Sequence, residues 1–165
     1  MADLKLNNVT ALSETGGVAT FGAPSSTLKY PAGHIIQIQH DTHATQSTQD
    51  IGTDIDSGLS QAITPLTGSD ILVMITFVMS MSANGSKDWT GFIKRGGSVI
   101  KTYNQMGRED HNSSPTDSYT VIYLDESPTA GSANTYTFGA NSNAGYIGFN
   151  WDNTPASMTL FEIAG

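Results

Sequence analysis

The chain has 165 residues, of which 38% are hydrophobic and 13% charged, and its formal net charge is −8 at pH 7. This length fits one domain with an appended segment. The acidic balance and the lack of a basic stripe argue against nucleic acid as a partner, and the absence of cysteine excludes disulfides, cysteine nucleophiles and thiolate metal sites.

Residues 1–30 differ from the rest of the chain and are predicted to form an N-terminal arm. Residues 3–7 alternate between polar and apolar side chains like a single strand, and residues 18–21 form another short apolar segment. A segment of this size cannot bury a core of its own. We therefore expect it to pair with an edge of the main domain or to dock on another molecule through Leu4, Leu6, Val9 and Leu12.

Residues 31–165 are predicted to form one all-β domain, an antiparallel β-sandwich. Short apolar segments separated by Gly, Ser, Asn and Thr at intervals of about 8–12 residues are typical of such folds. Residues 41–57 and 101–116 are polar and are expected to be connections, the first with one ragged strand. No helix of useful length is predicted. The expected strands cover residues 34–40, 59–64, 71–81, 89–95, 98–101, 118–124, 134–140, 145–151 and 157–164.

Residues 71–81 form the most apolar segment, which is too short for a membrane-spanning helix of about 20 residues and is predicted to be a buried strand. Both of its faces are apolar, so we expect the sandwich core to cover one face and the arm or a neighbouring subunit to cover the other. No secretory signal peptide is visible. The side chains expected at a subunit interface are Ile35, Ile36, Ile38, Leu72, Met74 and Val78.

The clearest local motif is the pair Gly96-Gly97, which separates two apolar strands. Glycine adopts positive φ at low cost at both central positions of a tight turn, so this pair predicts a β-hairpin.

No residue pattern points to catalysis. Serine, histidine and aspartate are present, but no serine lies in a G-x-S-x-G elbow. His34 and His40 are about 20 Å apart on one strand, too far for one metal ion. His40, Asp41 and His43 could converge at a bend, although a polar strand end is the favoured interpretation. Asp54 and Asp56, with Asp50, resemble the opening of a calcium loop that lacks its closing glutamate. We expect no cofactor and no metal.

Aromatic residues beside polar ones suggest a second hypothesis, a sugar-binding surface. The residues that would face a glycan are Trp89, Tyr103, Arg108 and His111, whereas Trp151 is expected to pack in the core or at an interface.

Several short motifs resemble a group of small structural proteins of tailed bacteriophages, notably marine ones. The resemblance covers most of the chain and rests on residues 1–8 (MADLKLNN), 30–37 (YPAGHIIQ), 93–98 (IKRGGS), 123–128 (YLDESP) and 158–165 (MTLFEIAG). It implies a jelly-roll-like sandwich that assembles as a homotrimer on a virion surface, and it carries no catalytic residues.

The expected function is therefore that of a non-enzymatic virion protein assembled in the host cytoplasm. Between positions on the particle, a capsid decoration (cement) protein docked on the major capsid protein is favoured, because the chain is short and lacks a fibre shaft. The alternative is the receptor-binding tip of a tail or head fibre that recognises host glycans. A free carbohydrate-binding or hydrolytic protein ranks lower.

Overall fold

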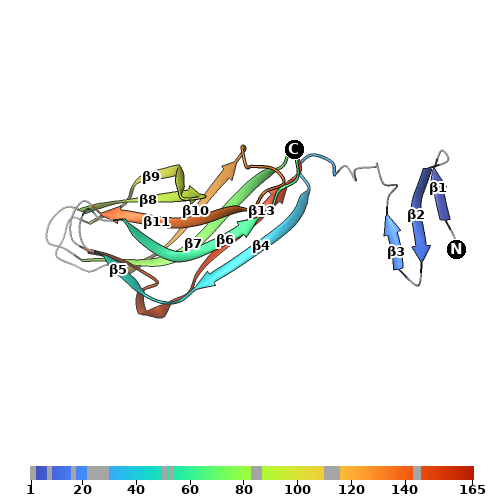
Figure 1. The fold of residues 1–165 in the computed structure, drawn as a ribbon. Helices are drawn as coiled ribbons and strands as arrows, with labels where there is room; N and C mark the ends of the chain where they lie inside the picture. The colour runs from blue at the N-terminus through green and yellow to red at the C-terminus, as the bar shows by residue number, and fades with distance from the viewer. Residues whose placement is uncertain are drawn as a thin grey trace. The chain divides into compact units, whose positions relative to one another are not determined.

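The computed structural model describes residues 3–6, 9–15, 18–21, 30–49, 52, 54–82, 87–109, 116–142 and 146–165. The chain divides into two units, Met1–Pro31 and Ala32–Gly165. In the first, β1 (Asp3–Leu6), β2 (Val9–Thr15) and β3 (Val18–Phe21) form an antiparallel sheet in that order (Figure 1). The sequence pattern predicts β1 as a strand, marks the residues of β3 only as a short apolar segment, and does not predict β2.

The second unit is built of antiparallel strands, which confirms the predicted all-β class. Its described residues contain no α-helix, only the short 3-10 turn η1 (Trp151–Asn153). No helical segment among them is long and apolar enough to cross a bilayer. The strands are β4 (Ile35–His43), β5 (Ser47–Gln49), β6 (Ile55–Ile63), β7 (Asp70–Ser82), β8 (Lys87–Arg95), β9 (Ser98–Glu109), β10 (Thr116–Asp125), β11 (Asn134–Ser142), β12 (Tyr146–Phe149) and β13 (Ala156–Ile163).

These strands form two sheets with the topology of a jelly roll (Figure 1). The four-stranded sheet has the order β6-β11-β8-β9, and β7 of the six-stranded sheet pairs with β10 on one side and with β12 and β13 on the other. β12 and β13 pair in turn with β5 and β4. If β4 with β5, and β12 with β13, each count as one interrupted strand, the order is that of an eight-stranded jelly roll.

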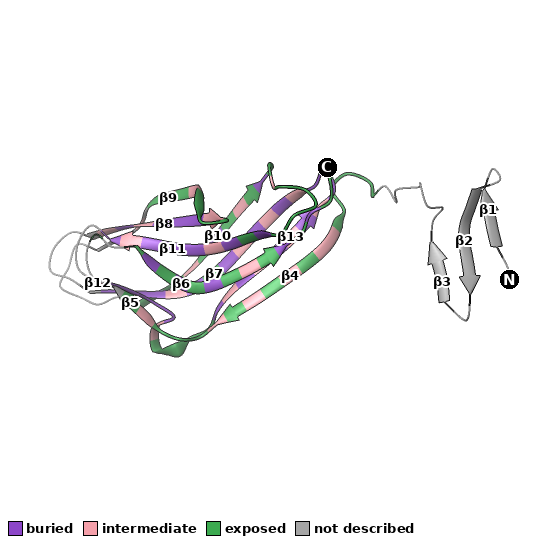
Figure 2. Ribbon diagram, viewed as in Figure 1, coloured by how far each residue is buried: buried purple, intermediate pink, exposed green. Residues whose placement is uncertain are grey.

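Phe77 lies at the centre of the core between the two sheets. Its ring contacts Trp89 and Phe138 of the four-stranded sheet at centroid distances of 5.9 and 4.8 Å, and Tyr119 and Phe149 of its own sheet at 5.6 and 5.3 Å. Such ring pairs contribute about 0.5–1.5 kcal/mol beyond area burial. Buried and more exposed residues alternate along the strands, and this alternation is visible as bands of colour in Figure 2.

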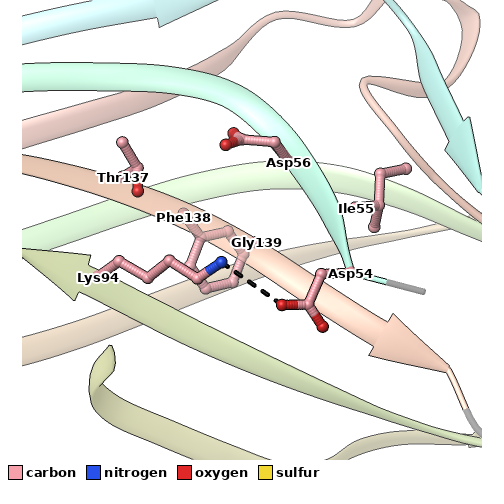
Figure 3. Close-up of a pocket in the computed structure, with 7 residues that line it drawn as sticks. All are labelled: Asp54, Ile55, Asp56, Lys94, Thr137, Phe138 and Gly139. Carbon is pink, nitrogen blue, oxygen red and sulfur yellow. Dashed lines mark hydrogen bonds and ion pairs between the residues drawn. The ribbon is translucent and has the colours of Figure 1, made fainter. Parts of the chain in front are cut away.

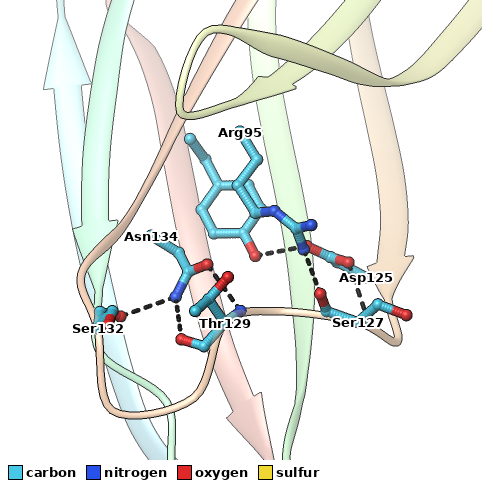
Figure 4. Close-up of polar contacts among 7 residues, drawn as sticks. Arg95, Asp125, Ser127, Thr129, Ser132 and Asn134 are labelled. Atoms are coloured by element: carbon cyan, nitrogen blue, oxygen red, sulfur yellow. Dashed lines mark hydrogen bonds and ion pairs between the residues drawn. The ribbon is translucent and has the colours of Figure 1, made fainter.

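The predicted hairpin at Gly96-Gly97 is confirmed, with φ of 56° and 84° at the two glycines. A polar cluster then joins this hairpin to the turn after β10 (Figure 4). The Asp125 carboxylate accepts hydrogen bonds from Arg95 Nη1 at 2.6 Å and from the Tyr136 hydroxyl at 2.7 Å. Burial, together with the hydrogen bond to Asp125 and its charge, raises the pKa of Tyr136. Burial lowers the pKa of Arg95, but its contacts with Asp125 outweigh that effect and raise it.

Two predicted connections are in fact strands. Residues 101–116 are predicted to be an exposed loop, but β9 continues to Glu109 because its inward residues, such as Tyr103 and Met106, pack against the core. Residues 41–57 contain the end of β4, all of β5 and the start of β6. In β6 the polar Ser57 is fully buried, because its hydroxyl donates to the Phe138 carbonyl at 2.8 Å. A buried serine that satisfies a backbone group interrupts the hydrophobic alternation from which a strand is recognised.

Candidate functional site

The two faces of β7 have different surroundings. Ile71, Val73 and Ile75 are fully buried in the core, whereas Leu72 and Met74 on the opposite face are half-buried. In the second unit no further layer of described residues covers that opposite face. The prediction that residues 71–81 form a buried strand is therefore confirmed. The expectation that a neighbour covers the second face stays a prediction.

Cross-strand registers extend this apolar surface over four strand positions. We call it the outer face and define it by three rows of side chains, each running from β4 through β13 and β7 to β10. The rows are Ile38, Phe161, Leu72 and Leu124; His40, Thr159, Met74 and Ile122; and Thr42, Ser157, Thr76 and Thr120.

The apolar part of the outer face is unusually exposed at its margins. Ile38 is 53% exposed, Ile122 58% and Leu124 40%. Ile35, beside this surface at the start of β4, is 55% exposed. Isolated exposed apolar residues are common, but a contiguous group of them on one sheet face indicates an interaction site.

The outer face contains no Lys, Arg, Asp or Glu, although the chain carries a net charge of −8. Its polar groups pair with one another: His40 Nδ1 lies 3.0 Å from Thr159 Oγ1, and the hydroxyls of Thr76 and Thr120 are 3.4 Å apart. Charge returns only beyond the last apolar row, at Asp70 and Glu126. A face without charge avoids like-charge repulsion when an anionic protein contacts another copy of itself.

The residues predicted at a subunit interface gather on or beside this surface. Ile38, Leu72 and Met74 belong to the outer face, and Ile35 and Ile36 lie at its β4 end, where the β4–β13 register shifts. Val78 is half-buried on the same side of β7. Sequence reasoning missed Phe161, Ile122 and Leu124, because the outer face becomes apparent only when the pairing of β7 with β13 and β10 is known.

The predicted glycan-facing group is not assembled by the structure. Trp89 is 1% exposed and packs edge-on against Phe77 and Tyr119, so the hypothesis that it stacks on a surface sugar is wrong. The Tyr103 hydroxyl donates to the Ile122 carbonyl at 2.8 Å. Burial raises the pKa of Tyr103, and the electrostatic effect of the nearby Tyr123 raises it further. The Arg108 side chain and His111 lie outside the described residues.

The candidate metal ligands also have other roles. His40 contacts Thr159, Asp41 accepts a hydrogen bond from the Ser60 amide at 3.0 Å, and the His43 ring lies against Gly58. His34 is exposed near the start of β4. Among the residues whose placement is described, no three His, Asp or Glu side chains gather as metal ligands.

A polar hollow of about 160 Å³ lies on the four-stranded sheet around Asp54, Asp56 and Lys94 (Figure 3). Lys94 Nζ approaches Asp54 Oδ2 at 3.4 Å, while the other Asp54 oxygen accepts from Asn141 Nδ2 at 3.1 Å. Asp56 Oδ1 accepts from the Gly58 amide at 3.0 Å. The Asp54 and Asp56 carboxylates thus already have partners within the chain. Asp50, its third residue, lies outside the described part of the chain.

The predicted docking residues of the N-terminal arm lie on β1 and β2. The backbone of these strands is described, but the side chains of Leu4, Leu6, Val9 and Leu12 lie outside the described part of the structure.

Comparison with known proteins finds matches among solved structures but none at the level of sequence. No family model and no curated protein matches the sequence. Solved structures of infectious bursal disease virus are similar: the Gt strain at 10% identity and TM-score 0.42, over 95% of this chain and 43% of that chain, and the Gx strain at 11% and 0.46, over 95% and 42%. Latent PorU from Porphyromonas gingivalis aligns at 12% identity and TM-score 0.40, over 88% of this chain and 14% of PorU. This chain spans less than half of each, and likenesses this low carry no argument about its function.

Proposed function

We propose that the chain is a non-enzymatic structural protein on the exterior of a bacteriophage particle, a capsid decoration protein. In this proposal it assembles as a homotrimer through the outer face, and its N-terminal unit docks on the major capsid protein. The observation that carries the proposal is the outer face itself, an uncharged surface four strand positions wide on an anionic chain, with six apolar side chains among its twelve.

Two further observations support a virion rather than another assembly. Jelly rolls are common among viral capsid domains, although lectins and cupins share the topology. The short motifs of the sequence resemble phage structural proteins. The fibre-tip alternative requires Trp89 to be exposed to a sugar, but Trp89 is buried in the core.

Immunogold labelling of intact phage particles that carry the gene tests the proposal, with an antibody raised against residues 32–165. Label distributed over the head supports a decoration protein. Label confined to the tail or to fibre tips refutes decoration in favour of the receptor-binding alternative, and absence of label refutes both.

The docking role of the N-terminal unit has its own test. A variant lacking residues 1–31 should fail to bind undecorated capsids, while a purified full-length chain binds them. Retained capsid binding by the truncated variant would refute docking through this unit. Light scattering of both proteins gives their masses, and a truncated chain that still forms the trimer separates loss of docking from loss of assembly.

A further inference from the structure

The free edge of β10 differs from the other sheet edges of the described sandwich. The pairings of the edge strands β4, β6 and β9 all contain register shifts, and the remaining edge strand β5 is only three residues long, whereas β10 pairs with β7 from Thr116 to Asp125 without interruption. Proteins protect exposed edges with bulges, lysine or proline. β10 has none of these and no glycine, so its edge is open to pairing with another strand.

Hydrogen bonds reveal which backbone groups point toward this free edge. The Val78 carbonyl of β7 accepts from the Asn150 amide at 2.9 Å, so the even-numbered residues of β7 point toward β12 and β13. Its odd-numbered residues therefore bond to odd-numbered residues of β10. The Tyr103 hydroxyl, which reaches the Ile122 carbonyl from β9, agrees with this assignment. The residues whose N–H and C=O groups point away from β7 are Thr116, Ser118, Thr120, Ile122 and Leu124.

We propose that β10 pairs antiparallel with β10 of a second copy of this chain, around a two-fold axis at Thr120. The inference rests on the proposed function only for its choice of a homotypic partner. This register opposes Thr120 to its own copy, Ser118 to Ile122, and Thr116 to Leu124, and so engages every edge-directed residue. It forms about ten backbone hydrogen bonds, two for each hydrogen-bonded residue pair.

Charge favours a second copy as the occupant of this edge. All five edge-directed residues are uncharged, so two chains of net charge −8 meet there without local repulsion. In the same register Asp117 faces Tyr123 of the second copy, and Lys101 Nζ lies 5.9 Å from the centre of the Tyr123 ring. The two-fold axis therefore brings an acidic and a basic side chain together twice.

The edge contact and the outer face can be used at the same time. Backbone groups of β10 point within the plane of the sheet, whereas the side chains of the outer face stand perpendicular to it. In a single chain the Tyr103 hydroxyl covers the Ile122 carbonyl. On pairing, the Ser118 amide of the second copy takes its place. Pairing thus doubles the number of chains in whatever assembly the outer face forms.

Thr120→Pro tests the edge contact, with Thr76→Lys as its matched control. The Thr120 amide makes no bond to β7, so proline removes the outward donor and leaves the β7 ladder intact, as edge strands tolerate. It also removes the Thr120 hydroxyl that lies 3.4 Å from that of Thr76, a contact that Thr76→Lys removes as well. Thr76 is the cross-strand neighbour of Thr120 on the outer face. In light scattering at equal concentrations, the wild-type mass should be twice that of Thr120→Pro. Thr76→Lys should keep the two-fold pairing while disturbing only the outer face. Equal masses for wild type and Thr120→Pro, or halving by Thr76→Lys alone, would overturn the proposal.

Hydrogen exchange on the wild-type chain keeps the test decisive even if the proline variant does not fold. The amides of Ser118, Thr120 and Ile122 should exchange at least tenfold more slowly at high than at low protein concentration, whereas that of Val121, already bonded to β7, should not change. Concentration-independent exchange at all four refutes the pairing. Because this readout needs no particles, paired β10 edges in a chain absent from virions would refute the proposed function alone.

Discussion

Replacing the exposed apolar side chains of β10 should weaken self-association through the outer face without destabilising the single chain. The variant is Ile122→Thr with Leu124→Thr, which keeps residues suited to a strand. Full burial of either original side chain is worth about 2 kcal/mol. Ile122 is 58% exposed and Leu124 40%, so the burial still to be gained is about 1.2 and about 0.8 kcal/mol. The total of about 2 kcal/mol corresponds to an increase of about 30-fold in the dissociation constant, or somewhat less because threonine keeps a methyl group.

Sedimentation equilibrium measures this dissociation constant, and thermal unfolding checks that the variant chain is folded. Val99→Thr is the matched control, because Val99 is also 52% exposed but lies on β9, away from the outer face. An unchanged dissociation constant in the double variant would refute the assignment of the outer face as the association surface. So would an equal weakening by Val99→Thr.

Three predictions concern the stability of the single chain. Asp125→Ala should lower the free energy of unfolding, measured in urea, by about 3 kcal/mol, because Arg95 and Tyr136 lose their shared acceptor. A decrease of less than a third of this value would contradict the prediction. Since the pKa of Tyr136 is raised in the folded chain, its contribution to stability should be constant up to the unfolded pKa near 10 and fall above it, and Tyr136→Phe should make the alkaline slope shallower while leaving the part that comes from Tyr103. Gly139→Ala should cost about 1–3 kcal/mol, because its methyl group would meet the Phe92 ring at 2.6 Å and the Ile55 carbonyl oxygen at 2.7 Å; wild-type stability in a thermal melt would contradict this prediction.

The sequence predicts the fold well where the local pattern and the tertiary environment agree. The hairpin at Gly96-Gly97 follows from two residues that tolerate positive φ, and β7 follows from its apolar composition. The prediction is wrong where a polar residue lies in a strand. Ser57 in β6 is buried through a hydrogen bond to the Phe138 carbonyl, and no local pattern indicates a bond to a residue so distant in the chain.

The outer face was only partly predictable for a related reason. Leu72 and Met74 stand out because both faces of their strand are apolar. Ile122 and Leu124 look unremarkable in β10, where apolar and polar residues are mixed. They join the same surface only through the unbroken register between β7 and β10. Trp89 illustrates the opposite error, since polar neighbours in the sequence suggested exposure whereas the ring packs against Phe77.

The distribution of charge connects the outer face with the free edge of β10. An anionic chain that associates with itself must keep acidic groups away from its contacts, since like charges brought together in a desolvated contact are costly. Here Asp125 is buried against Arg95, and Glu162 is buried where it accepts hydrogen bonds from Gln37 and from the Leu66 amide. Two carboxylates of the six-stranded sheet are thus satisfied within the chain, on the core side. Apart from His40, the side chains of the outer face and of the five edge-directed residues of β10 are apolar or hydroxyl-bearing, as contact between identical chains requires.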